Sequence, residues 1–129
     1  MKSGFKLDKV IFKMREGDKS GSLNECAIGG KWVDKTTDDF FKGKRVVLFS
    51  LPGAFTPTCS SQQLPGFENN FDAFKRFGID EVYCCSVNDA YVMNAWAYKM
   101  GIKNIKLIPD GNGSFSKQMG MLISKDHNG

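Results

Sequence analysis

The chain has 129 residues, of which 41% are hydrophobic and 11 are phenylalanine, enough for the core of one compact domain and too few for two ordinary ones. Its formal charge of +4 comes from 18 basic and 14 acidic residues scattered along the sequence, and no basic stripe interleaves with aromatic residues, which argues against nucleic-acid binding. No apolar run approaches the roughly 18 to 20 residues that span a membrane, and the N-terminus lacks the apolar region of a secretory signal. We therefore expect a single soluble domain over residues 1–129.

The cysteines and the histidine limit the kinds of site. The four cysteines show no C-x-x-C spacing and the single histidine is His127, so no zinc site is recognisable, and we expect neither a metal nor a cofactor. Cys84 and Cys85 are adjacent inside an apolar run, which favours reduced thiols in a cytoplasmic compartment over a secreted disulfide framework. Cys26 falls in a turn or strand and is assigned no role.

The first predicted elements are a short apolar run, a helix and a strand. The run VIFKM covers residues 10–14. Thr37 is suited to cap a short helix, with Asp38 and Asp39 in its first turn. RVVLFSL, residues 45–51, is a continuous apolar run of the kind found in strands that are buried on both faces.

A helical segment is predicted after this strand. Phe67, Phe71 and Phe74 recur at helical spacing, and Gly78 ends the helix. Pro65 lies inside the segment, where a proline kinks a helix or divides it. We therefore expect a helix that is bent or split in two.

Two further strands alternate with helices in the rest of the chain. EVYCCSV, residues 81–87, is the second predicted strand, and the helix after it is capped by Asn88 or Asp89 and ends at Gly101. KNIKLIP, residues 103–109, is the third strand, and a short helix around SFSKQMGM follows it. This alternation predicts an α/β fold with a central, mostly parallel sheet flanked by helices.

The segment LPGAFTPTC, residues 51–59, follows the first predicted strand directly. In sheets of this kind, functional groups gather at the carboxyl ends of the strands. Cys59 is expected at or within the first turn of the next helix, where unpaired N–H groups and the helix dipole favour an anion and hence the thiolate. Thr56 is expected to direct its hydroxyl toward the same point.

The prolines of this segment make it stiff. Pro52 and Pro57 remove two N–H donors and fix the backbone, and Pro52, Ala54 and Phe55 are expected to shield the sulfur from water. The segment lacks the histidine partner of acyl-transfer cysteine enzymes, which argues against a hydrolase. We interpret it as a preorganised thiolate pocket; the alternative for a cysteine on its own is a buried, inert side chain.

These residues resemble a known motif. The pattern P-x-x-x-T-x-x-C, formed here by Pro52, Thr56 and Cys59, is similar to the active-site motif of peroxiredoxins, and LPGAFTPTCSSQQLPGFENN resembles the type II and peroxiredoxin 5 subfamily of the AhpC/TSA-redoxin superfamily. VYCCSVNDAYVMNAW and IPDGNGSFSKQMGM are similar as well, so the resemblance covers roughly residues 37–123. It implies a thioredoxin-like fold and a thiol peroxidase.

The resemblance also implies roles for individual residues. Cys59 would be the peroxidatic cysteine, which attacks a peroxide oxygen of hydrogen peroxide or an organic hydroperoxide and becomes a sulfenic acid. Thr56 would hold the peroxide in line, the backbone N–H of Cys59 would donate to an oxygen, and Pro52 would limit solvent access. A homodimer through the active-site face, where Phe55 packs, is implied too.

The resemblance leaves open how the oxidised cysteine is recycled. Cys84 matches the resolving cysteine of plant type II enzymes, which forms an intramolecular disulfide after local unfolding. The alternative is that Cys84 is merely a small buried residue and that glutathione with glutaredoxin, thioredoxin or another external thiol is the reductant. By strand alternation Cys84 and Cys85 point to opposite faces, so at most one of them addresses Cys59.

One residue of the family pattern has no counterpart here. The family carries an arginine on a late strand that contacts the thiolate and the peroxide, and its position would fall beyond Gly129, whereas Arg15, Arg45 and Arg76 stand elsewhere. We therefore expect the chain to be C-terminally incomplete relative to the family, either as a fragment or as a truncated relative. The second function hypothesis is a catalytically weak redox-sensing or interaction module of the same fold.

Overall fold

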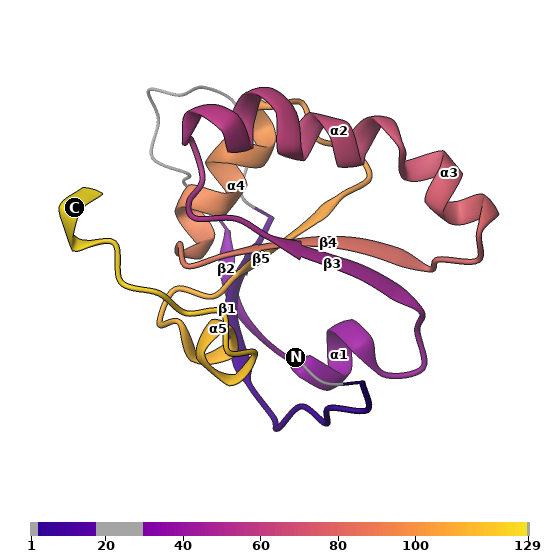
Figure 1. Cartoon of the computed structure of the whole chain (residues 1–129), viewed down its shortest axis with the longest axis horizontal. Helices are drawn as coiled ribbons and strands as arrows, with labels where there is room; N and C mark the ends of the chain where they lie inside the picture. Colours follow the sequence, from indigo (N-terminus) through magenta and orange to yellow (C-terminus); the bar gives the residue numbers. More distant parts are fainter. Residues whose placement is uncertain (1–2, 18–29, 129) are drawn as a thin grey trace.

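The computed structural model describes residues 3–17 and 30–128 (Figure 1). Its centre is a parallel sheet of three strands in the order β3-β4-β5, which are β3 Val46–Ser50, β4 Glu81–Ser86 and β5 Lys106–Pro109. All three strands lie inside the predicted apolar runs. The predicted α/β fold with a parallel central sheet is confirmed.

Helices cover both faces of this sheet (Figure 1). On one face lie α2 Leu64–Asn69, α3 Phe71–Arg76 and α4 Ala90–Lys99. On the other face lie α1 Thr37–Phe41 and α5 Ser114–Gln118. The sheet is therefore the middle layer of three, as expected for parallel strands joined by crossover helices.

Each face of the sheet has its own apolar cluster. Val82 and Cys84 of β4 belong to the first cluster, in which Trp96 of α4 is fully buried. Tyr83 and Cys85 of the same strand belong to the second cluster, because successive side chains of a strand point to opposite faces. No helix within the described residues is both long and apolar enough to cross a membrane.

A hairpin packs on the second cluster. Strand β1 Ile11–Glu16 pairs antiparallel with β2 Lys31–Thr36, and the Phe12 ring meets the rings of Phe40 and Phe115 edge-on at 5.5 and 5.6 Å. The sequence did not predict this hairpin, because β2 has the sequence KWVDKT and its side chains are half-buried or exposed. A strand of this composition has no apolar periodicity that could reveal it.

The cap of α1 differs from the prediction by one residue. Thr36, not Thr37, is the N-cap, because its Oγ1 accepts from the Asp39 N–H (3.4 Å) and the Asp39 carboxylate accepts from the Thr36 N–H (2.7 Å). The backbone and side-chain hydrogen bonds from Thr36 lower the pKa of Asp39. Thr37 is buried, and its hydroxyl accepts from the Val10 N–H (3.4 Å). Only the packing of the hairpin decides which threonine turns inward.

The helical segment after β3 is divided, though not at the proline. It begins at Pro57 and continues from Cys59 as a wide π-helical turn, η1 Cys59–Gln63, in which the Leu64 N–H donates to the Cys59 carbonyl. Pro65 then stands in the first turn of α2, directly after the wide turn. A proline is best tolerated in a first turn, because its missing N–H and the bulk of its ring disturb the helix least there. The break between α2 and α3 comes at Asn70.

Strand β5 begins later than the predicted residue 103. The N–H groups of Lys103, Asn104 and Ile105 donate to the Glu68 carboxylate at 2.9 Å each, so these residues do not pair with β4. Partial burial acts to raise the pKa of Glu68, but these hydrogen bonds outweigh it and hold the pKa below its ordinary value. A side chain of α2 therefore replaces the first part of the expected strand ladder.

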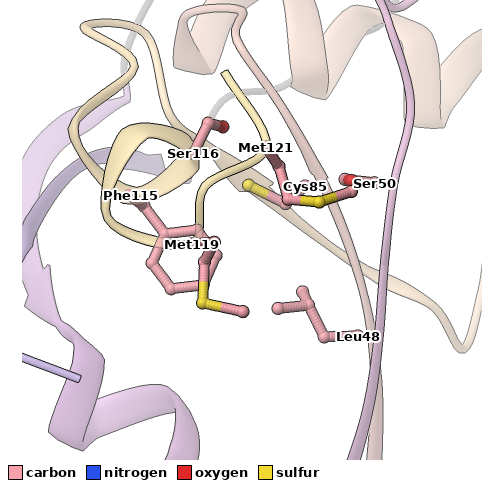
Figure 2. A pocket seen from close by; sticks show the side chains of 7 residues that line it. All are labelled: Leu48, Ser50, Cys85, Phe115, Ser116, Met119 and Met121. Carbon is pink, nitrogen blue, oxygen red and sulfur yellow. The ribbon is translucent and has the colours of Figure 1, made fainter. Parts of the chain in front are cut away.

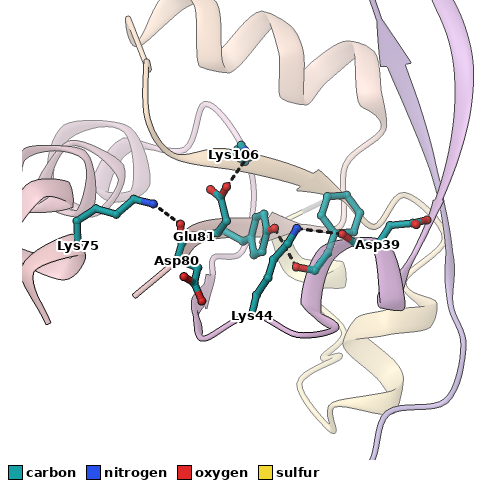
Figure 3. A network of polar contacts seen from close by, with 8 residues as sticks. Asp39, Lys44, Lys75, Asp80, Glu81 and Lys106 are labelled. Carbon is teal, nitrogen blue, oxygen red and sulfur yellow. Dashed lines mark hydrogen bonds and ion pairs between the residues drawn. The ribbon is translucent and has the colours of Figure 1, made fainter. Parts of the chain in front are cut away.

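Polar contacts join the amino ends of the strands (Figure 3). The Arg45 N–H donates to the Asp80 carboxylate (2.7 Å), the Lys75 ammonium donates to the Asp80 carbonyl, and Lys106 pairs with Glu81 (2.8 Å). Exposed ion pairs contribute at most about 1 kcal/mol each, so these contacts align the strands more than they stabilise the fold. The loops that carry the candidate site lie at the opposite, carboxyl ends of the strands.

Candidate active site

Cys59 lies in the first turn of the helix that follows β3, as predicted. This helix begins at Pro57, and the Ser60 N–H donates to the Thr56 carbonyl (3.0 Å), which closes the first turn. The Cys59 side chain is only 6% exposed and belongs to the first apolar cluster. The position combines low solvent access with the positive end of a helix, where an anion is favoured.

The residues that were expected to shield the sulfur have different environments. Ala54 packs against the cluster that contains Cys59, whereas Pro52 is exposed and the Phe55 side chain is 51% exposed. The φ angle of Phe55 is +65°, a left-handed conformation that bulky residues rarely adopt. Strain of this kind concentrates at functional sites. Ala54 is thus the one of the three that packs against the buried cluster.

The hydroxyl of Thr56 is oriented by its own loop. Thr56 Oγ1 donates its proton to the Gly53 carbonyl at 2.7 Å. A hydroxyl has one proton and two lone pairs, so in this arrangement its free capacity is as an acceptor. Thr56 can therefore accept a further hydrogen bond but has no proton left to donate to the sulfur.

Asn88 connects the loop before Cys59 to the end of β4. Its Oδ1 accepts from the Ala54 N–H (3.0 Å) and from the Ser86 hydroxyl (2.6 Å). The sequence offered Asn88 and Asp89 as alternative caps for α4, and Asp89 is the cap, because its carboxylate accepts from the Val92 N–H (2.9 Å). Because Asp89 caps the helix, the Asn88 side chain can bind the loop instead. Sequence reasoning missed this role of Asn88. Its only signal was that one residue of the predicted pair would not be needed as a cap.

Cys84 lies on the same face of the sheet as Cys59. Both belong to the first apolar cluster, and Cys84 is fully buried. Burial first, and then the nearby Cys59 thiol, raise the pKa of Cys84 to about 12. A thiol attacks as its thiolate, so Cys84 is a poor nucleophile while the sheet is intact.

Cys85 points to the opposite face, as strand alternation predicted. It lines an apolar cavity of about 170 Å³ together with Leu48, Phe115, Met119 and Met121 (Figure 2). Burial first, then Asp110 and Cys84, raise the pKa of Cys85 to about 12. The adjacent cysteines therefore have separate surroundings, and Cys84 is the one that shares a cluster with Cys59.

Two side-chain contacts brace the helix that carries Cys59. The Trp96 indole N–H donates to the Ser60 hydroxyl (3.0 Å), and the Gln63 amide donates to the Ser50 carbonyl (3.2 Å). Trp96 comes from α4, which lies on the same face of the sheet, and Ser50 comes from β3, so the helix is held by a neighbouring helix and by the sheet. Sequence reasoning missed both contacts, because each joins elements that are distant in the chain.

The arginines and the histidine belong to other segments than the one that carries Cys59. The Arg15 guanidinium lies over the rings of Trp32 (5.1 Å) and Tyr91 (4.8 Å), Arg45 precedes β3, and Arg76 ends α3. His127 belongs to a short 3-10 turn, Asp126–Asn128. Within residues 3–17 and 30–128, no group of three or more His, Cys, Asp or Glu side chains could hold a metal ion. The segment with Cys26 lies outside the described residues.

Comparison with known proteins gives consistent matches. Residues 16–128 match the Redoxin family model. A peroxiredoxin from Rhizobium etli is 65% identical over 124 residues, which cover 93% of this chain and 65% of that protein. The chain thus spans slightly less than two thirds of the length of this relative.

Solved structures agree with the family match. The Plasmodium falciparum antioxidant protein, described as a 1-Cys peroxiredoxin, superposes with a TM-score of 0.82 at 36% identity, over 95% of this chain and 69% of that one. Reduced Prx3 from Vibrio vulnificus in complex with hydrogen peroxide superposes with a TM-score of 0.76 at 35% identity, over 93% and 66% of the two chains. These neighbours share the thioredoxin-like architecture that the sequence predicted.

Proposed function

Since the chain belongs to the redoxin family, and within it to the peroxiredoxins, we propose that it reduces hydrogen peroxide and organic hydroperoxides with Cys59. The observation that carries the proposal is the position of Cys59, a nearly buried cysteine in the first turn of a helix at the carboxyl end of a parallel strand. The similarity to a peroxiredoxin structure that holds hydrogen peroxide supports the choice of substrate.

The proposed reaction transfers one oxygen atom to sulfur. The Cys59 thiolate attacks the nearer peroxide oxygen, the O–O bond breaks, and the sulfur retains that oxygen as a sulfenic acid. The distal oxygen leaves with the bonding electrons and takes up a proton, giving water or an alcohol. Thr56 accepts a hydrogen bond from the peroxide and holds it in line, while Pro52 fixes the backbone of the loop.

The reductant is proposed to be an external thiol. Reduction of the sulfenic acid needs a thiolate that reaches Cys59, and Cys84 is fully buried with a raised pKa. Glutathione with glutaredoxin, or thioredoxin, supplies such a thiol without opening the sheet. Cys84 becomes the resolving cysteine only if β4 unfolds locally, which would form a Cys59–Cys84 disulfide.

Replacing Cys59 tests the proposed activity directly. The variant Cys59→Ser should lose the thiol-dependent consumption of hydrogen peroxide and of an alkyl hydroperoxide, because serine offers no comparable nucleophile at neutral pH. Cys85→Ala, on the opposite face of the sheet, is the matched control and should keep the parent rate. Peroxide consumption by Cys59→Ser equal to that of the parent would refute the proposal.

A second candidate function is a redox-sensing or interaction module with slow turnover. The positions of the arginines favour it, because the resemblance implies that an efficient peroxidase has an arginine in contact with the thiolate. Arg15 lies over two aromatic rings, and Arg45 and Arg76 lie on the side of the amino ends of the strands. The rate constant of the parent chain with hydrogen peroxide separates the two functions. A value close to that of free cysteine identifies the module, and a much larger value identifies the peroxidase.

A homodimer through the active-site face is also proposed. The exposed, strained Phe55 offers an apolar ring beside the site, and aromatic residues are enriched in such interfaces. Sedimentation should give twice the chain mass, and Phe55→Asp should shift the protein toward the monomer. A parent chain that sediments as a monomer at high concentration would contradict the dimer.

A further inference from the structure

Asn88 holds the middle of the loop that precedes Cys59. The loop, residues 51–56, connects β3 to the helix, and the N–H of Ala54 donates to Asn88 Oδ1 at 3.0 Å. Other hydrogen bonds reach the start of the loop, such as that of the Leu51 N–H to the Cys85 carbonyl at 3.3 Å. Asn88 therefore fixes a part of the loop that the sheet ladder does not reach.

The orientation of the Asn88 amide is determined by its partners. Both the Ala54 N–H and the Ser86 hydroxyl donate to Oδ1, at 3.0 and 2.6 Å, and an amide oxygen has two lone pairs for two such donors. Because a backbone N–H is only a donor, the oxygen and not the nitrogen must face Ala54. Ser86 is 2% exposed and belongs to β4, so the acceptor is held by a rigid strand.

The contact at Ala54 is linked to the hydroxyl of Thr56. Ala54 is bonded to Gly53, and the Gly53 carbonyl accepts the Thr56 hydroxyl proton at 2.7 Å. If Ala54 moves, the acceptor that orients this hydroxyl moves with it. A displacement of about 1 Å in a reacting geometry costs roughly 100-fold in rate.

We propose that Asn88 is a positioning residue for the reaction of Cys59 with peroxide, acting through Ala54 and Gly53 on the Thr56 hydroxyl. The inference rests on the proposed peroxidase function for its kinetic consequence. The hydrogen bond that it requires, from Ala54 to Asn88, is independent of that function and is measurable separately.

Three variants of the full chain test the proposal. Asn88→Ala removes the acceptor, and Asn88→Asp keeps an oxygen acceptor at the same place. Asn112→Ala is the matched control, because Asn112 Oδ1 also accepts a loop N–H, from Ser114 at 3.0 Å, in the loop after β5. For each variant we would measure the rate of Cys59 oxidation by hydrogen peroxide, the rate of Cys59 alkylation by iodoacetamide, and the hydrogen exchange of the Ala54 amide.

The expected result separates peroxide positioning from general loosening. Asn88→Ala should react with peroxide roughly 10- to 100-fold more slowly, while its alkylation rate stays within about twofold of the parent, because alkylation needs a thiolate and no aligned peroxide. Asn88→Asp should recover the peroxide rate, compared on the plateau of each pH profile because the added charge alters the thiolate fraction. Asn112→Ala should match the parent.

Two results would overturn the proposal. One is an unchanged peroxide rate in Asn88→Ala, and the other is a fall in alkylation by the same factor as the peroxide reaction. If the parent itself reacts with peroxide no faster than free cysteine does, the proposed function fails. The hydrogen exchange of the Ala54 amide then tests the hydrogen bond from Ala54 to Asn88 on its own. Faster exchange of the Ala54 amide in Asn88→Ala, but not in Asn112→Ala, then supports the contact, and equal protection in both refutes it.

Discussion

Among single residues, Cys59 and the short segment around it are those on which the proposed chemistry depends. The cysteine is in the first helical turn, and Thr56 is three residues before it with its hydroxyl proton already donated to Gly53. The sequence predicted the helical position of Cys59, because a proline-rich turn between an apolar strand and a helix admits few alternatives. It could not predict the direction of the Thr56 hydroxyl, which depends on the conformation of the turn.

The role of the Thr56 hydroxyl is testable with two substitutions. Thr56→Val removes the hydroxyl and should slow the reaction of Cys59 with hydrogen peroxide by roughly 100- to 1,000-fold, the usual loss for one preorganised hydrogen-bonding group. Thr56→Ser keeps the hydroxyl and should stay close to the parent. The measurement is the second-order rate constant from rapid mixing. Equal rates in Thr56→Val and Thr56→Ser would show that the hydroxyl has no part in the reaction.

Cys84 should be unreactive in the folded chain. Its thiol is fully buried with a pKa raised to about 12, so at pH 8 almost none of it is thiolate. Treatment with iodoacetamide followed by peptide mass analysis should find Cys84 unlabelled in the native protein and labelled in denaturant. Labelling of Cys84 at a rate comparable to Cys59 in native buffer would mean that β4 opens readily, which would favour the disulfide mechanism.

At the scale of elements, side chains rather than backbone ladders decide several boundaries. Glu68 of α2 receives three N–H groups that the sequence assigned to the third strand, and Asp110, 1% exposed, receives the Phe115 and Ser116 N–H groups at the start of α5. The Glu68 contacts join residues that are distant in sequence and replace part of a ladder, whereas the Asp110 contacts are local and hold the start of a helix. Local propensity therefore finds the third strand but misplaces its start.

The Glu68 contact predicts a loss of stability in acid. Because its folded pKa is lowered, the stabilisation is complete above the unfolded value of about 4.5 and is lost as pH falls through the lower folded value. Glu68→Gln keeps one acceptor oxygen, so it should destabilise the chain by about 1 kcal/mol at pH 7. Urea unfolding at pH 7 and pH 3 measures this. A difference between parent and variant that does not shrink at pH 3 would contradict the role of the carboxylate.

At the scale of the whole molecule, the two faces of β4 bury two thiols in separate clusters. Cys84 and Cys85 both have a pKa raised from 9.0 to about 12. Between these values the unfolded chain has lost protons that the folded chain keeps, so the free energy of unfolding falls as pH rises. Stability from these groups is complete below pH 9 and decreases toward pH 12.

This alkaline loss is measurable with a single variant. Each thiol should contribute a slope of up to about −1.4 kcal/mol per pH unit above pH 9. Cys85→Ala removes one of them, so its unfolding free energy should depend less steeply on pH than that of the parent. Guanidinium unfolding between pH 8 and 11 provides the comparison, and identical slopes would show that Cys85 ionises equally in both states.

Several features were predictable from the amino-acid sequence: the α/β class, the three parallel strands, the opposite directions of Cys84 and Cys85, and the position of Cys59 in the first turn of a helix. These features follow from hydrophobic runs, strand alternation and a stiff turn, which are local properties. Tertiary structure alone decided the hairpin, the choice of Thr36 over Thr37 and of Asp89 over Asn88 as caps, and the hydrogen bond from Ala54 to Asn88. Each of these depends on which polar group finds a partner from a distant segment, and a linear pattern carries no such information.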